Sequence, residues 1–546
     1  MRYVLYGLPC AGKTTLLNGL NGIRTVCGSE TLRQLSGGRF SQMNAAERNT
    51  VRKAYTEYLK SLDDETIVSD GHYSFLDEVV FTKADAEVYD VFLYLYCPPE
   101  LLRERYCLSE KNSKYAALTI ERIEEWQASE IESLRNECHS RNKDFYVVRY
   151  GEISPELLSE FVAAIENGFS SFALAEQLVD RIAARYPTPC ELHLVDGDKT
   201  FINEDSFRLS TGNYKVKAFD GNFYTGFQSW LFAGEVRKLS FDYGKLDEVS
   251  LNETVRDRLK GKEFVILSAG VSELWERLAD KFGISTWFAD THISADTKYY
   301  VTKLLRWKGY RIVAYGDSRN DLYMLREADE GFLYIGGRMS SSLQMTDTRG
   351  VKLMYSKQPF FLAESGLIAD ADRRNIAVCR SDSGINGSAL AWAHFSLGKT
   401  LGRYVGTLVP DSGTAILVLE RGGRFFGEGF YCTFGGTFYP YNPKKECLPA
   451  IKEQHIIIVD SVINTGSSIL GVINAIRELR SDAEIFVAAN VIQERAVDTL
   501  RDFRLFSVRR SQNSYVGRNQ KQQDGKYGPD TADRLYNLIG SVTSNG

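Results

Sequence analysis

The fold of this chain is decided by the stretch Glu191-Leu192-His193-Leu194-Val195-Asp196-Gly197-Asp198-Lys199-Thr200. Its first half is a short, mostly apolar run that predicts a buried strand, and its second half places two carboxylates on the turn that follows. Short apolar runs of this kind alternate with segments of helical period along the whole chain. This alternation predicts an α/β protein built on parallel sheets.

Working outward, two other strands end in loops rich in glycine and hydroxyl side chains. One loop is Gly7-Leu8-Pro9-Cys10-Ala11-Gly12-Lys13-Thr14, and the other is Asp460-Ser461-Val462-Ile463-Asn464-Thr465-Gly466-Ser467-Ser468. At 546 residues the chain has room for about three domains. We therefore predict three Rossmann-like parallel-sheet domains, 1–167, 168–359 and 360–546. The strands expected to form them are Tyr3–Tyr6, Thr66–Ser69, Val91–Tyr96, Glu191–Val195, Phe264–Leu267, Arg311–Tyr315, Ala415–Leu419, His455–Val459 and Ala483–Ala489.

The two aspartates of the central stretch suit the hydrolysis of a phosphate monoester. Asp196 can attack phosphorus and form an aspartyl-phosphate, while Asp198 protonates the leaving oxygen. Three later pieces strengthen this hypothesis: Ser268 after the strand Phe264–Leu267, Lys298, and Gly316-Asp317-Ser318-Arg319-Asn320-Asp321 after the strand Arg311–Tyr315.

These four pieces, in this order, resemble the haloacid dehalogenase (HAD) superfamily over roughly residues 190–340. The resemblance implies that Asp196 is the nucleophile and Asp198 the general acid and base, and that Ser268 and Lys298 hold the phosphoryl group. It also implies a Mg²⁺ site, for which we expect the ligands Asp196, Asp198, Asp317 and Asp321.

The interval from Phe201 to Glu263 is long enough for a helical cap, which we place at about 202–262. It is rich in aromatic residues: Phe219, Phe223, Tyr224, Phe227, Trp230 and Phe232. They could stack on a substrate as a lid or simply fill the core of the cap, and packing is the commoner use of such residues.

The first loop has the spacing Gly-x-x-x-x-Gly-Lys-Thr, between a strand and a helix-compatible run. In such a P-loop the backbone N–H groups wrap phosphates, Lys13 neutralises their oxygens and the Thr14 hydroxyl ligates Mg²⁺. Asp70, after the strand Thr66–Ser69, is expected to orient the metal or the acceptor, and His72 is a second acceptor-side candidate.

The segment Leu93-Tyr94-Leu95-Tyr96-Cys97-Pro98-Pro99-Glu100, followed by Arg103 and Arg105, resembles small P-loop kinases of the nucleoside and nucleotide kinase group. The resemblance implies that one or both arginines close over the transferring phosphate; surface arginines on a helix are the alternative. The ATP-binding residues expected in this domain are Gly7, Gly12, Lys13, Thr14, Thr15, Asp70 and Arg105.

The third loop follows a buried strand that ends in Asp460. Its Thr465-Gly466-Ser467-Ser468 segment can wrap a 5′-phosphate with backbone N–H groups and hydroxyls, at what should be a helix N-terminus. Asp460 can then reach ribose hydroxyls. Some other Rossmann-like sheet with an Asp-ended strand is the alternative.

Asp460-Ser461, in place of two adjacent acids, resembles the uracil phosphoribosyltransferase branch, over roughly residues 370–540. So do Val418-Leu419-Glu420-Arg421-Gly422-Gly423 and Gly528-Pro529-Asp530-Thr531-Ala532-Asp533-Arg534-Leu535-Tyr536. The resemblance implies that Arg421 meets pyrophosphate and that Asp530 helps to hold phosphoribosyl pyrophosphate (PRPP) and its Mg²⁺; Arg380 is a weaker candidate. Lys526-Tyr527-Gly528-Pro529 departs from the family's base-reading turn, so the accepted base stays open. The PRPP-binding residues expected are Asp460, Asn464, Thr465, Gly466, Ser467, Ser468, Arg421 and Asp530.

The composition of the chain indicates which classes of partner and which cellular location to expect. The net charge is −5 with scattered Lys and Arg, so we do not expect a nucleic-acid partner. No apolar run is long enough to span a bilayer, and nine cysteines without a C-x-x-C pair fit reduced thiols. We expect a cytoplasmic enzyme, acting on nucleotides, a nucleobase and PRPP.

Together the resemblances predict a P-loop NTPase domain, a HAD domain with a helical cap and a type I phosphoribosyltransferase domain. The expected function is multifunctional nucleotide metabolism: an ATP-dependent kinase, a Mg²⁺-dependent phosphatase and a phosphoribosyltransferase, with ATP and PRPP as substrates. Two alternatives stay open, namely nucleic-acid end repair by a polynucleotide kinase-phosphatase-like pair and a nucleotide-sensing stress or defence protein. A homo-oligomer formed through the third domain is also left open.

Overall fold

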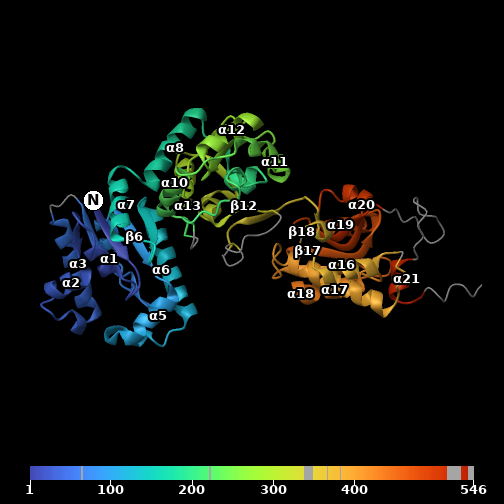
Figure 1. Cartoon of the computed structure of the whole chain (residues 1–546), viewed down its shortest axis with the longest axis horizontal. Coiled ribbons are helices and arrows are strands. Elements are labelled where there is room, and N and C mark those ends of the chain that lie inside the picture. Colours follow the sequence, from blue (N-terminus) through green and yellow to red (C-terminus); the bar gives the residue numbers. More distant parts are fainter. Residues whose placement is uncertain are drawn as a thin grey trace, which may run out of the picture. The chain divides into compact units, whose positions relative to one another are not determined.

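The computed structural model of the chain describes residues 1–62, 66–219, 223–336, 343, 348–365, 367–381, 383–512 and 530–538. It contains three large sheets, each flanked by helices (Figure 1). The chain divides into two compact units: one holds residues 1–333 and 346–352, the other 334–345 and 353–546. The predicted α/β class with several parallel sheets is confirmed.

The first sheet has the strand order β2-β3-β1-β6-β7, and all neighbours are parallel. Its strands are β1 (Arg2–Tyr6), β2 (Arg24–Val26), β3 (Ile67–Asp70), β6 (Val91–Tyr96) and β7 (Asp144–Arg149). The strands are runs of Val, Leu, Tyr and Phe that are buried on both faces, as a parallel sheet between helices requires.

Helices cover both faces of this sheet. They are α1 (Lys13–Asn18), α2 (Gly28–Leu35), α3 (Ala45–Lys60), α4 (Lys83–Val88), α5 (Pro99–Leu108), α6 (Ile120–Arg141) and α7 (Pro155–Glu166). Two short strands, β4 (Ser74–Phe75) and β5 (Glu78–Val79), form a hairpin. Local sequence sets the helix starts: Asn44 and Glu47 form a capping box at α3, and Pro155 occupies the first turn of α7 behind the cap residue Ser154.

The second sheet has the order β10-β9-β8-β11-β12-β13, with β8 and β11 side by side at its centre. Its strands are β8 (Glu191–Val195), β9 (Phe264–Ser268), β10 (Trp287–Ala289), β11 (Arg311–Gly316), β12 (Glu330–Ile335) and β13 (Lys352–Tyr355). The helices are α8 (Ser171–Arg185), α9 (Ser206–Ser210), α10 (Gly226–Val236), α11 (Glu253–Leu259), α12 (Ser272–Phe282), α13 (Ala295–Trp307) and α14 (Leu322–Glu327). A turn (Gly197–Phe201) follows β8, and a 3₁₀ turn (Arg319–Asp321) precedes α14.

The expected cap interval 202–262 holds α9, α10 and α11, but α10 packs against the first sheet. Thr225 Oγ1 accepts a hydrogen bond from Val147 N at 3.2 Å, and Gln228 Nε2 donates to Val147 O at 2.8 Å. These bonds satisfy backbone groups on β7, which is an edge strand of the sheet as far as the described residues show. Phe227 joins the core of the first sheet, with its ring 4.8 Å from that of Phe161. Part of the aromatic set therefore packs against the first sheet.

The third sheet has the order β14-β19-β18-β17-β15-β16, and all its pairs are parallel. Its strands are β14 (Phe360–Phe361), β15 (Thr414–Leu419), β16 (Thr437–Tyr441), β17 (His455–Ile463), β18 (Glu484–Gln493) and β19 (Arg504–Ser511). The helices are α16 (Asp370–Cys379), α17 (Ser388–Val405), α18 (Arg424–Phe434), α19 (Ser467–Leu479), α20 (Glu494–Thr499) and α21 (Thr531–Leu535).

Glycines bring α17 and α18 into close contact. A Cβ on Gly398 would lie 2.1 Å from the backbone oxygen of Phe426, and one on Gly429 would lie 2.0 Å from that of Phe395. Only glycine fits at such a helix crossing.

All nine predicted strands are present. The main difference lies in the third sheet, where β17 and β18 run past their expected ends. Asp460 consequently lies within β17 and not just beyond it. Within the described ranges, no helix has the length and apolar character needed to cross a membrane.

Candidate functional site

The central candidate site lies where β8, β9 and β11 end. Asp196 follows β8, Ser268 is the last residue of β9, and Asp317 follows β11. Because β8 lies between β9 and β11 and all three are parallel, their carboxyl ends meet at one edge of the sheet. The fold thus brings together residues that are far apart in sequence, at the edge where α/β sheets bind ligands.

Three carboxylates converge at this edge. Oxygens of Asp196, Asp317 and Asp321 all lie within 4.8 Å of one another. Asp321 is fixed by Ser318, whose N and Oγ donate to its Oδ2 at 3.1 and 2.7 Å. A Cβ on Gly316 would lie 2.3 Å from the Asp321 Cβ, so glycine is what lets the β11 end approach this acid.

Lys298, on the first turns of α13, lies buried among these acids. Its Nζ donates to Asp196 Oδ1 at 2.5 Å and to Asp321 Oδ1 at 2.7 Å. Thr200 Oγ1 lies 3.3 Å from Asp317 Oδ1 and 3.5 Å from Asp196 Oδ2. The sequence-based grouping of Asp196, Lys298, Asp317 and Asp321 thus corresponds to one cluster in space.

The electrostatics of the cluster favour a bound cation. Burial, followed by repulsion from Asp321, raises the pKa of Asp196 to about 7. The pKa of Asp317 is also raised, by burial and by the charge of Asp196. Burial alone would lower the pKa of Lys298, but the charges of Asp196 and Asp321 outweigh it and raise that pKa. One ammonium cannot balance three carboxylates, and carboxylate oxygens are the ligands that Mg²⁺ prefers, so the donor set fits that ion.

The Asp198 side chain lies apart from the three converging carboxylates, and its expected role as a Mg²⁺ ligand stays a prediction. Its Oδ1 accepts from Ser206 N at 2.6 Å and its Oδ2 from Trp275 Nε1 at 3.3 Å, and its side chain is not in the group of three acids. Burial, and then the charge of Asp205, raises the pKa of Asp198. A raised pKa suits a carboxyl group that must carry a proton near neutral pH.

Ser268 is packed beside the turn that carries both aspartates. Its Oγ accepts from Gly270 N at 3.0 Å, and a Cβ on Gly197 would lie 2.8 Å from that oxygen. The same Cβ would lie 2.2 Å from the ring of Trp275. Sequence reasoning missed Trp275, which has no motif around it; it also missed Ser318, although its Ser-x-x-Asp spacing to Asp321 is that of a helix cap.

In the first sheet, the loop from Gly7 to Thr14 joins β1 to α1. Lys13 is buried, and its Nζ donates to Gly7 O at 2.6 Å and Leu8 O at 3.0 Å. Its Nζ also lies 3.5 Å from His72 Nδ1. Burial lowers the pKa of Lys13 to about 8, against the opposing charge of Asp70. The lysine is folded back onto the backbone carbonyls of its own loop.

Asp70, at the end of β3, ties two parts of this site together. Its Oδ2 accepts from Thr14 Oγ1 at 2.7 Å, and its Oδ1 from Gly28 N at 2.7 Å. Arg105 Nη1 donates to Cys10 O at 2.8 Å, and its guanidinium lies 4.3 Å from the centre of the Tyr150 ring. Arg103, the other arginine considered above, is exposed on α5.

These residues line a cavity of about 870 Å³. It contains the loop residues Gly12, Lys13, Thr14 and Thr15 together with Asp70, His72 and Arg105. The lining also includes side chains that sequence reasoning did not single out, among them Arg33, Phe40, Arg52, Tyr55, Phe75, Asp85, Tyr89, Asn112 and Tyr150. They come from separate elements without a common motif, so only the fold brings them together.

In the third sheet, the candidate residues meet where the strand order reverses. The chain moves from β15 outward to β16 and then returns to β17 on the other side of β15. Ligands bind at such crevices in open α/β sheets. The loop after β15 lies against Asp460: a Cβ on Gly422 would lie 3.6 Å from Asp460 Oδ1 and 3.3 Å from Ser461 Oγ.

The loop from Asn464 to Ser468 leads into the N-terminus of α19. Gly466 has φ 81°, a left-handed conformation, and a Cβ there would lie 3.2 Å from Leu500 and Thr499. Asn464 Oδ1 accepts from Gln493 Nε2 at 2.8 Å, and Thr465 Oγ1 from Ser467 N at 3.3 Å. Ser468 is the second residue of α19. Burial raises the pKa of Asp460 to about 7.

Asp530 caps α21, accepting from Ala532 N at 2.8 Å. A different acid of α21, Asp533, forms an ion pair with Arg421: its Oδ1 lies 3.1 Å from Arg421 Nη2. Arg380 contributes its backbone oxygen to Arg534 at 3.1 Å. The segment Lys526–Pro529 lies outside the described residues.

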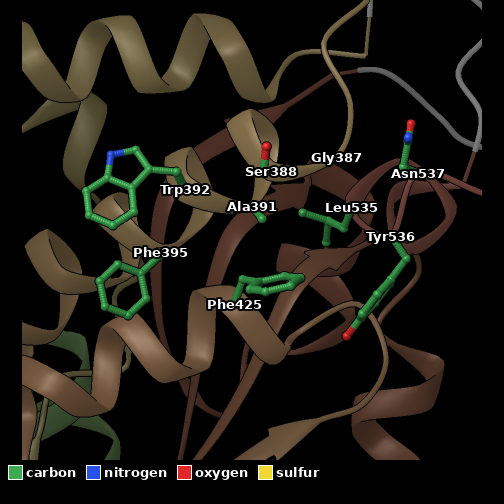
Figure 2. Close-up of a pocket in the computed structure, with 9 residues that line it drawn as sticks. All are labelled: Gly387, Ser388, Ala391, Trp392, Phe395, Phe425, Leu535, Tyr536 and Asn537. Atoms are coloured by element: carbon green, nitrogen blue, oxygen red, sulfur yellow. The ribbon is translucent and has the colours of Figure 1, made fainter.

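An apolar pocket of about 480 Å³ opens beside α21 (Figure 2). Trp392 and Phe395 from α17 line one side, and Phe425 and Tyr536 the other, with Ser388 at the start of α17. The Tyr536 hydroxyl also donates a hydrogen bond to Arg421 O at 3.4 Å, and this bond links the pocket to the loop after β15.

Comparison with a family model agrees with the central site. Residues 235–326 match the haloacid dehalogenase-like hydrolase family. The matched segment includes Ser268, Lys298, Asp317 and Asp321, whereas Asp196 and Asp198 precede it. The chain therefore contains a HAD-like hydrolase domain. It matches no curated protein.

Several solved structures are similar to parts of the chain. The AQ2163 protein of Aquifex aeolicus is 13% identical, with 33% of this chain and 98% of that one covered and a TM-score of 0.27. A HAD family hydrolase of Salmonella enterica serovar Typhi is 18% identical, with 33% and 75% covered and a TM-score of 0.20. A phosphoserine phosphatase with a phospho-aspartyl intermediate analogue is 15% identical, with 31% and 95% covered and a TM-score of 0.22.

Proposed function

We propose that the hydrolase domain cleaves phosphate monoesters through a covalent aspartyl-phosphate on Asp196. The observation that carries this proposal is Lys298, whose buried ammonium bridges Asp196 and Asp321 at 2.5 and 2.7 Å. Such a bridge orients one carboxylate oxygen of Asp196 and leaves the other for attack. It also supplies positive charge where phosphoryl oxygens must sit.

In the first step, the free carboxylate oxygen of Asp196 attacks phosphorus and the bond from phosphorus to the ester oxygen breaks. Asp198 gives its proton to the leaving alcohol oxygen. In the second step, Asp198 takes a proton from a water molecule, whose oxygen attacks the same phosphorus. The aspartyl–phosphate bond breaks, and Asp196 is regenerated with release of inorganic phosphate.

Lys298 and Ser268 would hold the phosphoryl oxygens during both steps. Asp196, Asp317 and Asp321 would hold Mg²⁺, which when bound neutralises the charge of the phosphoryl group. Trp275 and Ser206 keep the Asp198 carboxyl in place through the bonds described above.

We further propose that the first domain is an ATP-dependent kinase. The folded-back Lys13, the Thr14–Asp70 contact and Arg105 over the loop form a cradle for a nucleotide triphosphate. Thr14 would contribute to a Mg²⁺ site on the nucleotide, and Asp70 would orient it.

The third domain is proposed to transfer a phosphoribosyl group from PRPP to a nucleobase. Support comes from the placement of Asp460 and the loop Asn464–Ser468 at the point where the strand order reverses. Arg421, paired with Asp533 at 3.1 Å, would meet the pyrophosphate. With these three activities the chain would act as a cytoplasmic, multifunctional enzyme of nucleotide metabolism.

One panel of assays tests the three activities. The full chain with Mg²⁺ is offered phosphorylated metabolites and a 3′-phosphorylated oligonucleotide, and phosphate release is measured. Release from metabolites supports nucleotide metabolism; strong preference for the oligonucleotide would support end repair instead. Pyrophosphate release from PRPP with a panel of bases, and ATP consumption with nucleosides and nucleotides, test the other two domains. Release of no phosphate from any substrate would refute the proposed hydrolysis.

A further inference from the structure

Helix α6 belongs to the first sheet but also forms part of the surroundings of the hydrolase site. Towards its middle, Glu130 accepts from Ser74 N at 2.9 Å and from Tyr94 OH at 2.9 Å, inside the first domain. Further along, Arg135 and His139 are buried against the hydrolase domain. One helix therefore has contacts in both domains of the first compact unit.

Arg135 contacts three separate pieces of the hydrolase domain. Its Nε lies 3.2 Å from Asp296 Oδ1, its Nη1 donates to Tyr323 OH at 2.8 Å, and its Nη2 donates to Phe223 O at 2.9 Å. The side chain is only 5% exposed, and that of Asp296 only 3%. The guanidinium thus donates hydrogen bonds to Tyr323 and Phe223 and forms an ion pair with Asp296, a set of contacts that suits its planar, rigid fork.

Two partners of Arg135 are close in sequence to active-site residues, and the third is linked to one of the same segments through a backbone hydrogen bond. Asp296 precedes Lys298 by two residues in the first turns of α13, and Tyr323 follows Asp321 by two residues at the start of α14. Phe223 precedes Tyr224, whose backbone oxygen accepts from Ala295 N at 3.2 Å. Arg135 thus acts on the two backbone segments that carry Lys298 and Asp321.

We infer that Arg135, a residue of the kinase-like domain, is a positioning residue of the hydrolase site. It holds the turn that carries Lys298 in register with the turn that carries Asp321, so that the ammonium reaches both Asp196 and Asp321. A displacement of about 1 Å at a catalytic group is enough to cost a large part of the rate. This inference rests on the proposed hydrolysis at Asp196, and it makes the hydrolase site dependent on the first domain.

A buried ion pair that serves only to join two domains is the competing explanation. The two explanations differ in what a lysine at position 135 would do. Lysine keeps the positive charge beside Asp296 but lacks the fork that also reaches Tyr323 and Phe223. Asp296 in addition keeps His139, whose Nε2 lies 2.7 Å from Asp296 Oδ1, so the carboxylate is not left alone.

The test compares the full-length wild type with Arg135→Lys and with Arg122→Lys as a matched control. Arg122 lies on the same helix, about half exposed, in ion pairs with Asp77 and Glu125. With saturating Mg²⁺ and the best monoester substrate, Arg135→Lys is expected to lower kcat at least tenfold while KM changes less than threefold. Its thermal unfolding midpoint should stay within a few degrees of the wild type, and Arg122→Lys should change neither. Folded Arg135→Lys with kcat within twofold of the wild type would overturn the inference.

A second readout needs no turnover. Beryllium trifluoride, a phosphoryl mimic that binds carboxylates, is titrated calorimetrically into each variant with Mg²⁺ present. Its affinity for Arg135→Lys is expected to fall at least tenfold, and unchanged affinity contradicts the positioning role. If the wild type binds beryllium trifluoride but hydrolyses no monoester, the proposed function fails, while the calorimetric comparison still decides the role of Arg135.

Discussion

Replacing Asp196 by asparagine should abolish phosphate-ester hydrolysis and yet leave the metal-free protein at least as stable as before. Asparagine has the shape of aspartate and keeps an oxygen that can accept from Lys298, but it is no nucleophile. Lys298 also retains Asp321 as a partner at 2.7 Å, so its charge stays paired. The structure thus separates the chemical role of Asp196 from any role in holding the fold.

The size of the stability change follows from the pKa of Asp196. Burial and Asp321 raise it from 3.8 to about 7. In the folded, metal-free protein the Asp196 carboxyl keeps its proton up to about pH 7, whereas in the unfolded chain the same carboxyl loses its proton near pH 4. Wild-type stability therefore falls as pH rises between these values, by at most about 4 kcal/mol. Asparagine removes this dependence, so we expect a gain of about 1–4 kcal/mol at pH 8 and none below pH 4.

The assay is urea unfolding of both proteins at pH 4 and pH 8, first with chelator and then with Mg²⁺. Mg²⁺ should stabilise the wild type and not the variant, because a ligand stabilises only the state that binds it. Asp257→Asn, at an exposed ion pair with Lys260, is the control and should change neither stability nor turnover. A variant that is less stable than wild type in chelator at pH 8, or that keeps a tenth of the turnover, would refute this reasoning.

Four further outcomes are expected. Gly316→Ala should lower monoester turnover more than tenfold and the free energy of unfolding by about 1–3 kcal/mol, because the new Cβ would lie 2.3 Å from the Asp321 Cβ. Gly234→Ala is the matched control, because a Cβ at Gly234 would have no atom within 4 Å. Equal effects of the two substitutions would contradict the packing argument. Lys13→Met should remove ATP binding, measured by calorimetry, and leave monoester hydrolysis unchanged. Wild-type ATP affinity should be constant below pH 8 and weaken above it, because the pKa of Lys13 is lowered to about 8 and ATP binds its charged form; affinity that rises with pH would contradict this. Arg421→Gln should weaken PRPP binding at least tenfold without changing the other two sites, and unchanged PRPP affinity would remove Arg421 from the proposed pyrophosphate site.

The strands and the central cluster could be predicted from sequence because their signals are local or ordered along the chain. Buried parallel strands are short apolar runs, and chemistry-bearing residues follow them at fixed offsets. Asp196 and Asp317 follow such strands, and the resemblance to the HAD superfamily groups Lys298 and Asp321 with them. The loop residues Lys13 and Thr14 could likewise be placed between a strand and a helix from their spacing alone.

Contacts between distant segments left no such signal. Arg135 and Asp296 are 161 residues apart in the sequence and lie in different helices. Nothing in the sequence of either helix predicts that the two residues are in contact. The same holds for Arg33 and Arg52 in the cavity beside Lys13. These contacts depend on how distant elements pack together, and the packing cannot be read from a single sequence.

Two side-chain placements follow from packing and backbone geometry, and no motif in the sequence predicts them. The aromatic residues of the interval 202–262 were expected in a cap, but Thr225 and Gln228 bond to the exposed edge of β7, and Phe227 follows them into the core of the first sheet. The Asp198 carboxylate accepts from Ser206 N and Trp275 Nε1 and lies outside the group of three acids, so its expected role as a Mg²⁺ ligand stays a prediction. Both placements arise because buried polar groups form hydrogen bonds with whichever side-chain or backbone partners the folded chain brings close to them.

The central claim, a phosphorylated Asp196, can be tested most directly by trapping the intermediate. The full chain is mixed with its best monoester substrate and Mg²⁺, quenched, and reduced with borohydride, which converts an aspartyl-phosphate to homoserine. Peptide mass spectrometry should then find homoserine at position 196 and at no other aspartate. Phosphate release with no homoserine at 196, or with homoserine elsewhere, would contradict the account.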